Sequence, residues 1–134
     1  MAQRIEDYAV IGDLHTAALV GLDGSIDWLC LPHFDSPACF ARLLGHKSHG
    51  FWQIAPVGAP NSVLATRRWY RPDSLVLETE FDTATGTVRI TDCMPNREGH
   101  PHLVRSVEGV SGTVDMHMEL VVRFDYGDVV PWVT

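Results

Sequence analysis

Apolar and polar residues alternate through residues 114–124, and this period of two constrains the fold more than any other feature of the chain. The apolar positions are Val114, Met116, Met118, Leu120, Val122 and Phe124, and of the positions between them only Val121 is apolar. Successive side chains of a β-strand point to opposite faces of the sheet, so the pattern predicts a strand rather than a helix. We therefore expect a long antiparallel strand whose apolar face lies in a core.

Short apolar stretches separated by turn residues recur along the rest of the chain, which favours further strands. Two strands are predicted at about residues 15–22 and 25–31, joined at Asp23-Gly24, a pair that favours the type I′ hairpin turn. With turns at 71–74 and 82–86 and a loop at 95–102, the other strands are predicted at residues 51–55, 63–70, 75–81, 88–92 and 103–110.

One segment carries the signals of a helix. Ser36 is a capping residue, Pro37 suits the first helical position, and Gly45 follows the last one. The larger apolar residues between them would share one face of a helix. We expect one short helix of about two turns near residues 37–44, and no other.

About seven to nine strands with a single short helix are typical of an all-β fold, an antiparallel β-sandwich. The chain has 134 residues, 46% of them hydrophobic and 20% charged, which suits one domain with its own core. We assign residues 1–134 to that single domain. The sequence ends on the apolar stretch 129–134 without a polar tail, so we expect a truncated chain and an incomplete sandwich.

The charge and composition of the chain exclude several classes of partner. Ten basic and seventeen acidic side chains give a formal net charge of −7, so we expect no nucleic acid as a partner. No apolar run is long enough to cross a membrane, and Glu6 and Asp7 fall where a secretory signal would be apolar. Three cysteines without a CxxC pair fit reduced thiols. We therefore expect a cytoplasmic protein.

The sequence predicts neither a metal centre nor a cofactor. His46 and His49 lie three residues apart, and His100 and His102 flank a proline, but neither pair has the spacing of a zinc site. The glycine-rich and nucleophile motifs of nucleotide-binding proteins and of serine hydrolases do not occur.

The densest group of ionisable residues near aromatic side chains lies in the first third of the chain. The group consists of Asp13, His15, Asp27, His33 and Asp35, with Trp28 and Phe34 next to two of the carboxylates. A ring that stacks on a pyranose, beside a carboxylate that accepts its hydroxyl protons, is the chemistry of a sugar-binding site. The alternative is that Asp13 and Asp35 accept hydrogen bonds from loop amides while Trp28 fills the core.

No pair of catalytic carboxylates is assigned. Glycoside hydrolysis needs two carboxyl groups on either side of one bond, at a separation that a sequence does not give. The glutamates are Glu6, Glu78, Glu80, Glu98, Glu108 and Glu119. Most of them fall on polar faces; Glu78 and Glu80, for instance, alternate with apolar residues in the predicted strand 75–81. We expect these faces to be solvated.

A series of short motifs follows in one order along nearly the whole chain. The motifs are Ile11-Gly12-Asp13, Thr16 to Val20, Asp23 to Trp28, Pro32 to Pro37, Leu43 to Gly45, Gly50 to Pro56 and Arg123 to Gly127. In this order they resemble the opening of bacterial and archaeal glycoside hydrolase family 15 proteins of the trehalase and glucoamylase type.

This resemblance implies a β-sandwich of the supersandwich type that precedes an (α/α)6 barrel. In that family two glutamates of the barrel carry out an inverting hydrolysis of α-glucosidic bonds. None of the elements predicted here corresponds to the barrel, so we expect a non-catalytic accessory domain, or a fragment of one, that packs against it.

The resemblance also suggests where a substrate would lie. The loop at 32–36 would border the active-site mouth, with Asp13, Trp28, His33 and Asp35 close to an α-glucoside. Many relatives carry arginine where this chain has His33. The change would weaken a charged contact and make it pH-dependent, or it is a plain surface substitution.

Two other functions stay open on the sequence alone. A free-standing carbohydrate-binding module would use Trp28, Trp52 or Trp69 as a stacking platform. A structural fragment would form a homo-oligomer, because an incomplete sandwich leaves an unpaired edge and an apolar face. Exposed tryptophans would favour the first, and self-association in solution would favour the second.

Overall fold

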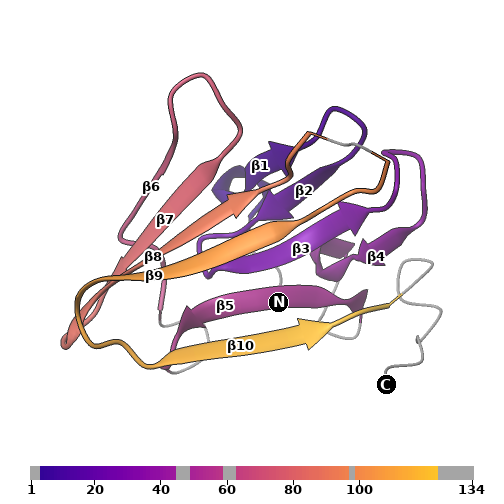
Figure 1. Cartoon of the computed structure of the whole chain (residues 1–134). Helices are drawn as coiled ribbons and strands as arrows, with labels where there is room; N and C mark the ends of the chain where they lie inside the picture. Colours follow the sequence, from indigo (N-terminus) through magenta and orange to yellow (C-terminus); the bar gives the residue numbers. More distant parts are fainter. Residues whose placement is uncertain (1–3, 45–48, 59–62, 97–98, 124–134) are drawn as a thin grey trace.

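The chain folds into two antiparallel β-sheets in a computed structural model that describes residues 4–44, 49–58, 63–96 and 99–123 (Figure 1). The six-stranded sheet contains β1 (Ala9–Gly12), β2 (Ala17–Val20), β3 (Ser25–Cys30), β4 (Ala38–Phe40), β5 (Phe51–Pro56) and β10 (Met116–Val121). The four-stranded sheet contains β6 (Arg67–Tyr70), β7 (Leu77–Asp82), β8 (Gly86–Cys93) and β9 (Val104–Gly112). The predicted all-β sandwich is therefore confirmed.

Most strands pair with the strand that precedes or follows them in the sequence. The first sheet has the order β1-β2-β3-β5-β10, with β4 also paired to β3, and the second has the order β6-β7-β8-β9. Besides the strands, the described residues contain two single 3-10 turns, Ile5–Asp7 and Arg42–Leu44. No helix in this part of the chain is long and apolar enough to cross a membrane.

The β2–β3 hairpin occurs where Asp23-Gly24 predicts it, but its turn is not of type I′. Gly24 has a φ of 77°, whereas Asp23 is not among the residues with positive φ. The Gly24 amide donates to the carbonyl of Gly21 at 3.1 Å, as in a type I turn that is followed by a left-handed glycine. A Cβ at position 24 would lie only 2.1 Å from the carbonyl oxygen of Ile54, so the turn requires glycine here.

The strand predicted at residues 15–22 begins too early. β1 precedes it, residues 13–16 form a loop, and β2 covers only Ala17–Val20. The loop turns at Leu14, just before the predicted start, where a φ of 75° is incompatible with extended backbone. The other predicted strands occur within a few residues of their expected places, although β6 is confined to Arg67–Tyr70.

The helix predicted near residues 37–44 is wrong. Residues 38–40 form β4 instead, which pairs with β3 so that Phe40 lies opposite Leu29, and the single 3-10 turn follows. Residues 38–41 are all buried, whereas an amphipathic helix buries one face only. Pairing with β3 therefore outweighs the local capping signals. Gly45, which was expected to end the helix, lies outside the described residues.

β10 confirms the strand that was predicted from the alternation, but not its buried face. Met118 lies opposite Ile54 and Leu120 opposite Trp52, so both side chains point to the same side as the buried Ile54. Yet Met118 is 62% exposed and Leu120 is 50% exposed. The prediction of a core face is therefore wrong for these positions. Phe124, the last position of the pattern, lies outside the described residues.

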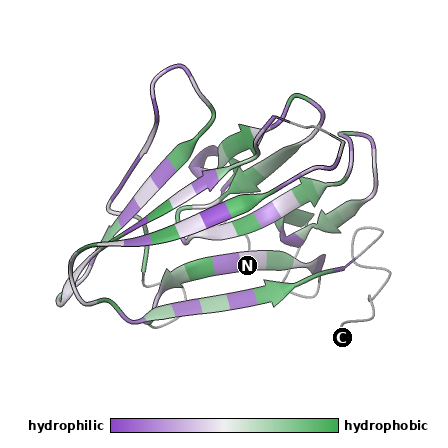
Figure 2. Cartoon of the chain, in the orientation of Figure 1, coloured by the Kyte–Doolittle hydropathy of each residue, from purple (hydrophilic) through white to green (hydrophobic). Residues whose placement is uncertain are grey.

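β9 and β10 follow one another in the chain but belong to different sheets, and each is the outermost described strand of its sheet (Figure 1). Val107 of β9 lies opposite the buried Ile90, yet it is 48% exposed. The interior of the sandwich is thus uncovered along these two strands. We call this surface, with Val107, Met118 and Leu120 on it, the open edge. The bands of hydrophobic residues on both strands can be followed in Figure 2.

The core lies between the sheets in two clusters of buried side chains. The first cluster consists of Ile11, Ala18, Val20, Ile26, Leu29, Cys39, Phe40, Leu77 and Met94. The second consists of Ile54, Phe81, Val88 and Ile90. Both clusters combine residues of the two sheets, so the sheets are held together by apolar contact.

A buried arginine adds a polar connection between the two sheets. Arg105 of β9 donates from Nε to Oδ1 of Asp92 in β8 at 2.7 Å. Its Nη1 and Nη2 donate at 2.7 Å to the carbonyls of Trp52 and Gly24, which belong to the six-stranded sheet and its β2–β3 turn. The side chain of Arg105 is 0% exposed. A single guanidinium therefore satisfies two backbone carbonyls of one sheet and a carboxylate of the other.

Candidate functional site

Two loops meet where the beginning of β2 lies beside the end of β3. We call them the loop pair: residues 13–16 between β1 and β2, and residues 31–37 between β3 and β4. The amide of Phe34 donates to the carbonyl of His15 at 3.0 Å. The rings of His15 and His33 meet edge to face with their centroids 6.0 Å apart. The loop pair thus brings together part of the ionisable group that the sequence indicates.

Asp13 is buried and holds the first loop in shape. Its Oδ1 accepts hydrogen bonds from the amides of His15 at 2.9 Å and Thr16 at 3.0 Å. The hydroxyl of Thr16 donates to the carbonyl of Cys30, which ties the loop to the end of β3. Asp13 therefore accepts loop amides, as the alternative interpretation of the sequence expects.

His33 and Asp35 lie on the exposed surface of the second loop. The amide of His33 donates to the hydroxyl of Ser36 at 3.1 Å, and the amide of Ser36 donates back to the carbonyl of His33. Trp28 is half-buried and packs against the cluster of Cys30, Ala38 and Ala41. Trp28 is therefore part of the packing of β3, whereas His33 and Asp35 face solvent.

The three tryptophans considered for a stacking platform differ in their surroundings. Trp52, like Trp28, is half-buried and packs against the core. Trp69 of β6 is exposed, but the guanidinium of Arg89 lies 5.9 Å from the centre of its ring. Trp69 is thus the one of the three that has an exposed ring, and a cation already occupies one face of it.

Asp27 does not join the loop pair but lies in a buried ionic cluster with Asp23 and Arg42. Its Oδ2 accepts the hydroxyl of Tyr8 and its Oδ1 that of Ser25, both at 2.5 Å. Arg42 lies 3.7 Å from Asp27 and 3.9 Å from Asp23. Burial, followed by repulsion from Asp27, raises the pKa of Asp23 above its usual value. One buried cation is thus shared by two carboxylates.

Sequence reasoning missed the role of Arg42 because it placed that residue on a helix. One signal was available, since Asp23, Ser25 and Asp27 occupy alternate positions around β3 and so share one side. Three hydrophilic side chains on one side of an otherwise apolar strand require a buried polar partner. The sequence does not show that the partner lies at position 42.

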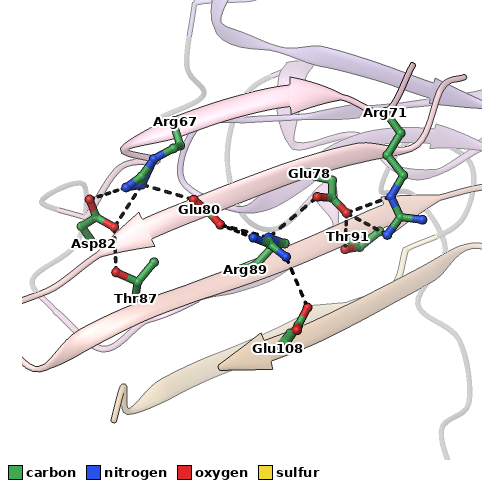
Figure 3. A network of polar contacts seen from close by, with 9 residues as sticks. All are labelled: Arg67, Arg71, Glu78, Glu80, Asp82, Thr87, Arg89, Thr91 and Glu108. Carbon is green, nitrogen blue, oxygen red and sulfur yellow. Dashed lines mark hydrogen bonds and ion pairs between the residues drawn. The ribbon is translucent and has the colours of Figure 1, made fainter. Parts of the chain in front are cut away.

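A ladder of ion pairs covers one face of the four-stranded sheet (Figure 3). Glu80 of β7 lies 2.8 Å from Arg89 and 3.3 Å from Arg67, and Glu78 lies 2.8 Å from Arg71. The expectation that Glu78 and Glu80 are solvated is wrong, because both carboxylates are buried beneath the arginines. Sequence reasoning underestimated arginine, whose long stem covers the sheet while its head group pairs with the carboxylate.

The described residues contain no group of three or more potential metal ligands. Cys30, Cys39 and Cys93 are free, and burial raises the pKa of the Cys39 thiol to about 11. Such a thiol is a poor nucleophile near neutral pH, so Cys39 is a small core residue. His46 and Glu98, considered above with the histidines and glutamates, lie outside the described residues.

Comparison with known proteins gives one consistent family. A family model described as "Trehalase-like, N-terminal" matches residues 1–133. The trehalase of Mycobacterium tuberculosis is 36% identical over 141 residues, which cover 91% of this chain and 20% of that protein. The trehalase of Thermoplasma volcanium is 34% identical, with 96% of this chain and 21% of that protein covered.

A third relative, trehalase 2 of Sulfolobus acidocaldarius, is 31% identical, and the aligned region covers 90% of this chain and 19% of that protein. No solved structure gives a significant match. The chain therefore spans about a fifth of the length of the curated relatives that it matches. The family match over nearly all residues agrees with the series of motifs that begins at Ile11-Gly12-Asp13. The chain belongs to the trehalase-like N-terminal family.

Proposed function

We propose that this chain is the non-catalytic N-terminal accessory domain, or part of that domain, of a family 15 glycoside hydrolase that acts on α-glucosides such as trehalose. One observation carries the proposal: nearly the whole chain matches only about a fifth of each trehalase, at its N-terminal end. The catalytic part of such a protein lies in the other four-fifths. The natural partner of this chain is then that catalytic domain, an (α/α)6 barrel by the resemblance.

Within this proposal the loop pair borders the active-site mouth. His33 and Asp35 are the residues that face solvent there, and both offer hydrogen-bonding groups suited to sugar hydroxyls. Asp13 supports their position through the first loop, and Trp28 supports it through the packing of β3 and β4. We assign no catalytic residue, metal or cofactor to this chain. The free cysteines fit a reducing compartment, and we propose a cytoplasmic location.

Glucose release by the isolated chain and by a chimera tests the accessory role. We expect the 134-residue chain to release no glucose from trehalose or a maltooligosaccharide above a blank from cells without it. We also expect it to restore trehalase activity when it replaces the N-terminal fifth of the Mycobacterium tuberculosis trehalase, because the two segments are 36% identical over 91% of this chain. The readout is glucose release by the purified proteins.

A truncated trehalase without its N-terminal fifth is the control for the chimera, and it is expected to be inactive or unstable. Steady glucose release by the 134-residue chain that persists through repurification would contradict a non-catalytic role. A chimera that is no more active than the truncated control would contradict the accessory role.

The open edge leaves one side of β9 and of β10 without a described neighbour. We propose that further strands of the parent protein cover it, because edge strands with one unpaired side and exposed apolar positions favour pairing. In their absence we expect the 134-residue chain to self-associate through this surface. Val107→Lys and Met118→Lys should together weaken that association at least tenfold, because each would place a charge in the contact. Molar mass by light scattering over a range of concentrations measures the effect.

Leu75→Lys is the matched control, since Leu75 has a similar exposure but lies outside the strands, just before β7. A chain that stays monomeric at every accessible concentration would exclude the homo-oligomer. If Leu75→Lys weakens self-association equally, added charge acts at any position on the surface, and the open edge is not the contact.

A further inference from the structure

Two apolar side chains project from the loop pair into solvent. Leu14 is 86% exposed, more than any other large hydrophobic residue described, and Phe34 is 63% exposed. The amide of Phe34 donates to the carbonyl of His15, which follows Leu14, so the two side chains leave the surface from adjacent backbone. Single exposed apolar residues are common, but two that project from loops joined by a hydrogen bond form a defined surface.

Leu14 is also held in an unfavourable backbone conformation. Its φ of 75° lies in the left-handed region, where glycine would fit without strain. Leu14 lies inside a turn closed by Asp13, whose Oδ1 accepts hydrogen bonds from the amides of His15 and Thr16. A strained residue whose side chain gains no burial in its own domain indicates that the gain occurs in a contact with another one.

The loop pair is rigid enough to present these side chains in one geometry. The hydroxyl of Thr16 is bonded to the end of β3, and the segment from His33 to Ser36 is closed by two hydrogen bonds. Side chains that are already positioned lose less freedom when they bind, and buried aromatic anchors dominate many interfaces. Leu14 and Phe34 therefore have the properties of anchors.

We propose that Leu14 and Phe34 dock this domain onto the catalytic domain of the same hydrolase by filling apolar pockets on it. The proposal rests on the proposed function. The length of the relatives indicates what the two side chains contact. About four-fifths of each relative lies beyond the matched segment, and that larger part is the partner we propose for this fifth. The open edge offers backbone to further strands, whereas the loop pair offers two side chains that suit a preformed surface.

The test uses the chimera with the Mycobacterium tuberculosis trehalase. Leu14→Gly with Phe34→Ala should shorten the half-life of trehalase activity at elevated temperature at least tenfold, because the catalytic domain loses its contact. Ile5→Ala removes an apolar side chain of similar exposure in the first 3-10 turn and should change the half-life less than twofold. Activity at low temperature, measured in parallel, shows that the chimeras are folded.

The same substitutions in the 134-residue chain separate docking from folding. Leu14→Gly should raise the thermal midpoint of that chain by a few degrees, because it relieves the strain, and Phe34→Ala should leave it nearly unchanged. A stabilised chain together with a short-lived chimera is the expected combination. A lower midpoint of the chain with Leu14→Gly would mean that Leu14 stabilises its own domain, and would overturn the proposal.

Three other results would decide against the anchors. An unchanged half-life in an active chimera would overturn them and leave the accessory role intact. An unsubstituted chimera without activity would overturn the accessory role, and the anchors with it. If the 134-residue chain forms a dimer that Leu14→Gly and Phe34→Ala dissociate, the occupant is a second copy and not the catalytic domain.

Discussion

Replacing Arg105 by methionine is expected to lower the free energy of unfolding by about 3–5 kcal/mol, the effect of removing one partner of a buried ion pair. Asp92 would keep a buried carboxylate without its cation. The carbonyls of Trp52 and Gly24 would each lose a hydrogen bond of 2.7 Å. Methionine preserves much of the volume, so the loss reports the polar connection rather than a cavity.

Urea unfolding followed by tryptophan fluorescence measures the effect of Arg105→Met. Arg67→Met is the control, because the pair of Arg67 with Asp82 at 2.6 Å is exposed and contributes about 0–1 kcal/mol. Glu80, the buried second partner of Arg67, keeps its contact with Arg89 at 2.8 Å. Adding Asp92→Asn to Arg105→Met should recover part of the loss, since it removes the unpaired charge. Similar losses for Arg105→Met and Arg67→Met would contradict the importance given to the buried pair.

Arg42→Met is expected to be about as destabilising at neutral pH as Arg105→Met. Its effect on the free energy of unfolding should shrink as the pH falls. Arg42 is the cation between Asp23 and Asp27, and its guanidinium also lies 5.1 Å from the centre of the Phe51 ring. Without it the two carboxylates remain buried and repel one another. We expect a loss of about 3–5 kcal/mol at pH 7.

The pH dependence follows from the pKa of Asp23, which burial and Asp27 raise above 3.8 in the folded chain. The folded state then binds this proton more tightly than the unfolded state, so the stability that Asp23 contributes is present at low pH. It is lost as the pH rises through the pKa of the folded state. Arg42 lowers that pKa, so Arg42→Met raises it further. The stability that the variant loses relative to the unsubstituted chain therefore grows toward neutral pH.

Unfolding in urea at several values between pH 4 and pH 7 measures this dependence. Arg71→Met serves as the control, because Arg71 is exposed and its loss leaves Asp23 untouched. Whatever stability Arg71→Met loses through Glu78 should not follow the titration of Asp23. A deficit of Arg42→Met that is the same at every pH would show that the cluster does not respond to protonation of Asp23.

The sequence predicted the elements that depend on neighbouring residues. The β2–β3 hairpin, the strand β10 and the turn between β7 and β8 have local signals, because a glycine or a period of two is enough to place them. The prediction for residues 38–44 was wrong because the local signals favour a helix, whereas the burial of the segment is decided by pairing with β3. The prediction of a buried face for β10 was wrong because burial depends on what covers a strand, and the strand's own sequence does not contain that information.

The candidate site was predictable in part for a similar reason. Asp13 is explained by the two amides that follow it, and the sequence already allowed that interpretation. Arg105 could not be found, because it binds the carbonyl of a residue 81 positions away. Arg42 likewise meets residues of the β2–β3 turn and of β3 only after the chain has folded. Polar networks between distant segments are a property of the fold, whereas caps and turns are a property of short sequences.

The pairing of β5 with β10 has a consequence for how the chain is made. Between these two strands lies the whole of the four-stranded sheet, whose neighbours in space are also neighbours in sequence. On the ribosome, β5 has to wait with a free edge until Met116 has been synthesised, while β6 to β9 can pair in order as they emerge. The sheet of local hairpins is therefore able to form during translation, and the six-stranded sheet is completed last.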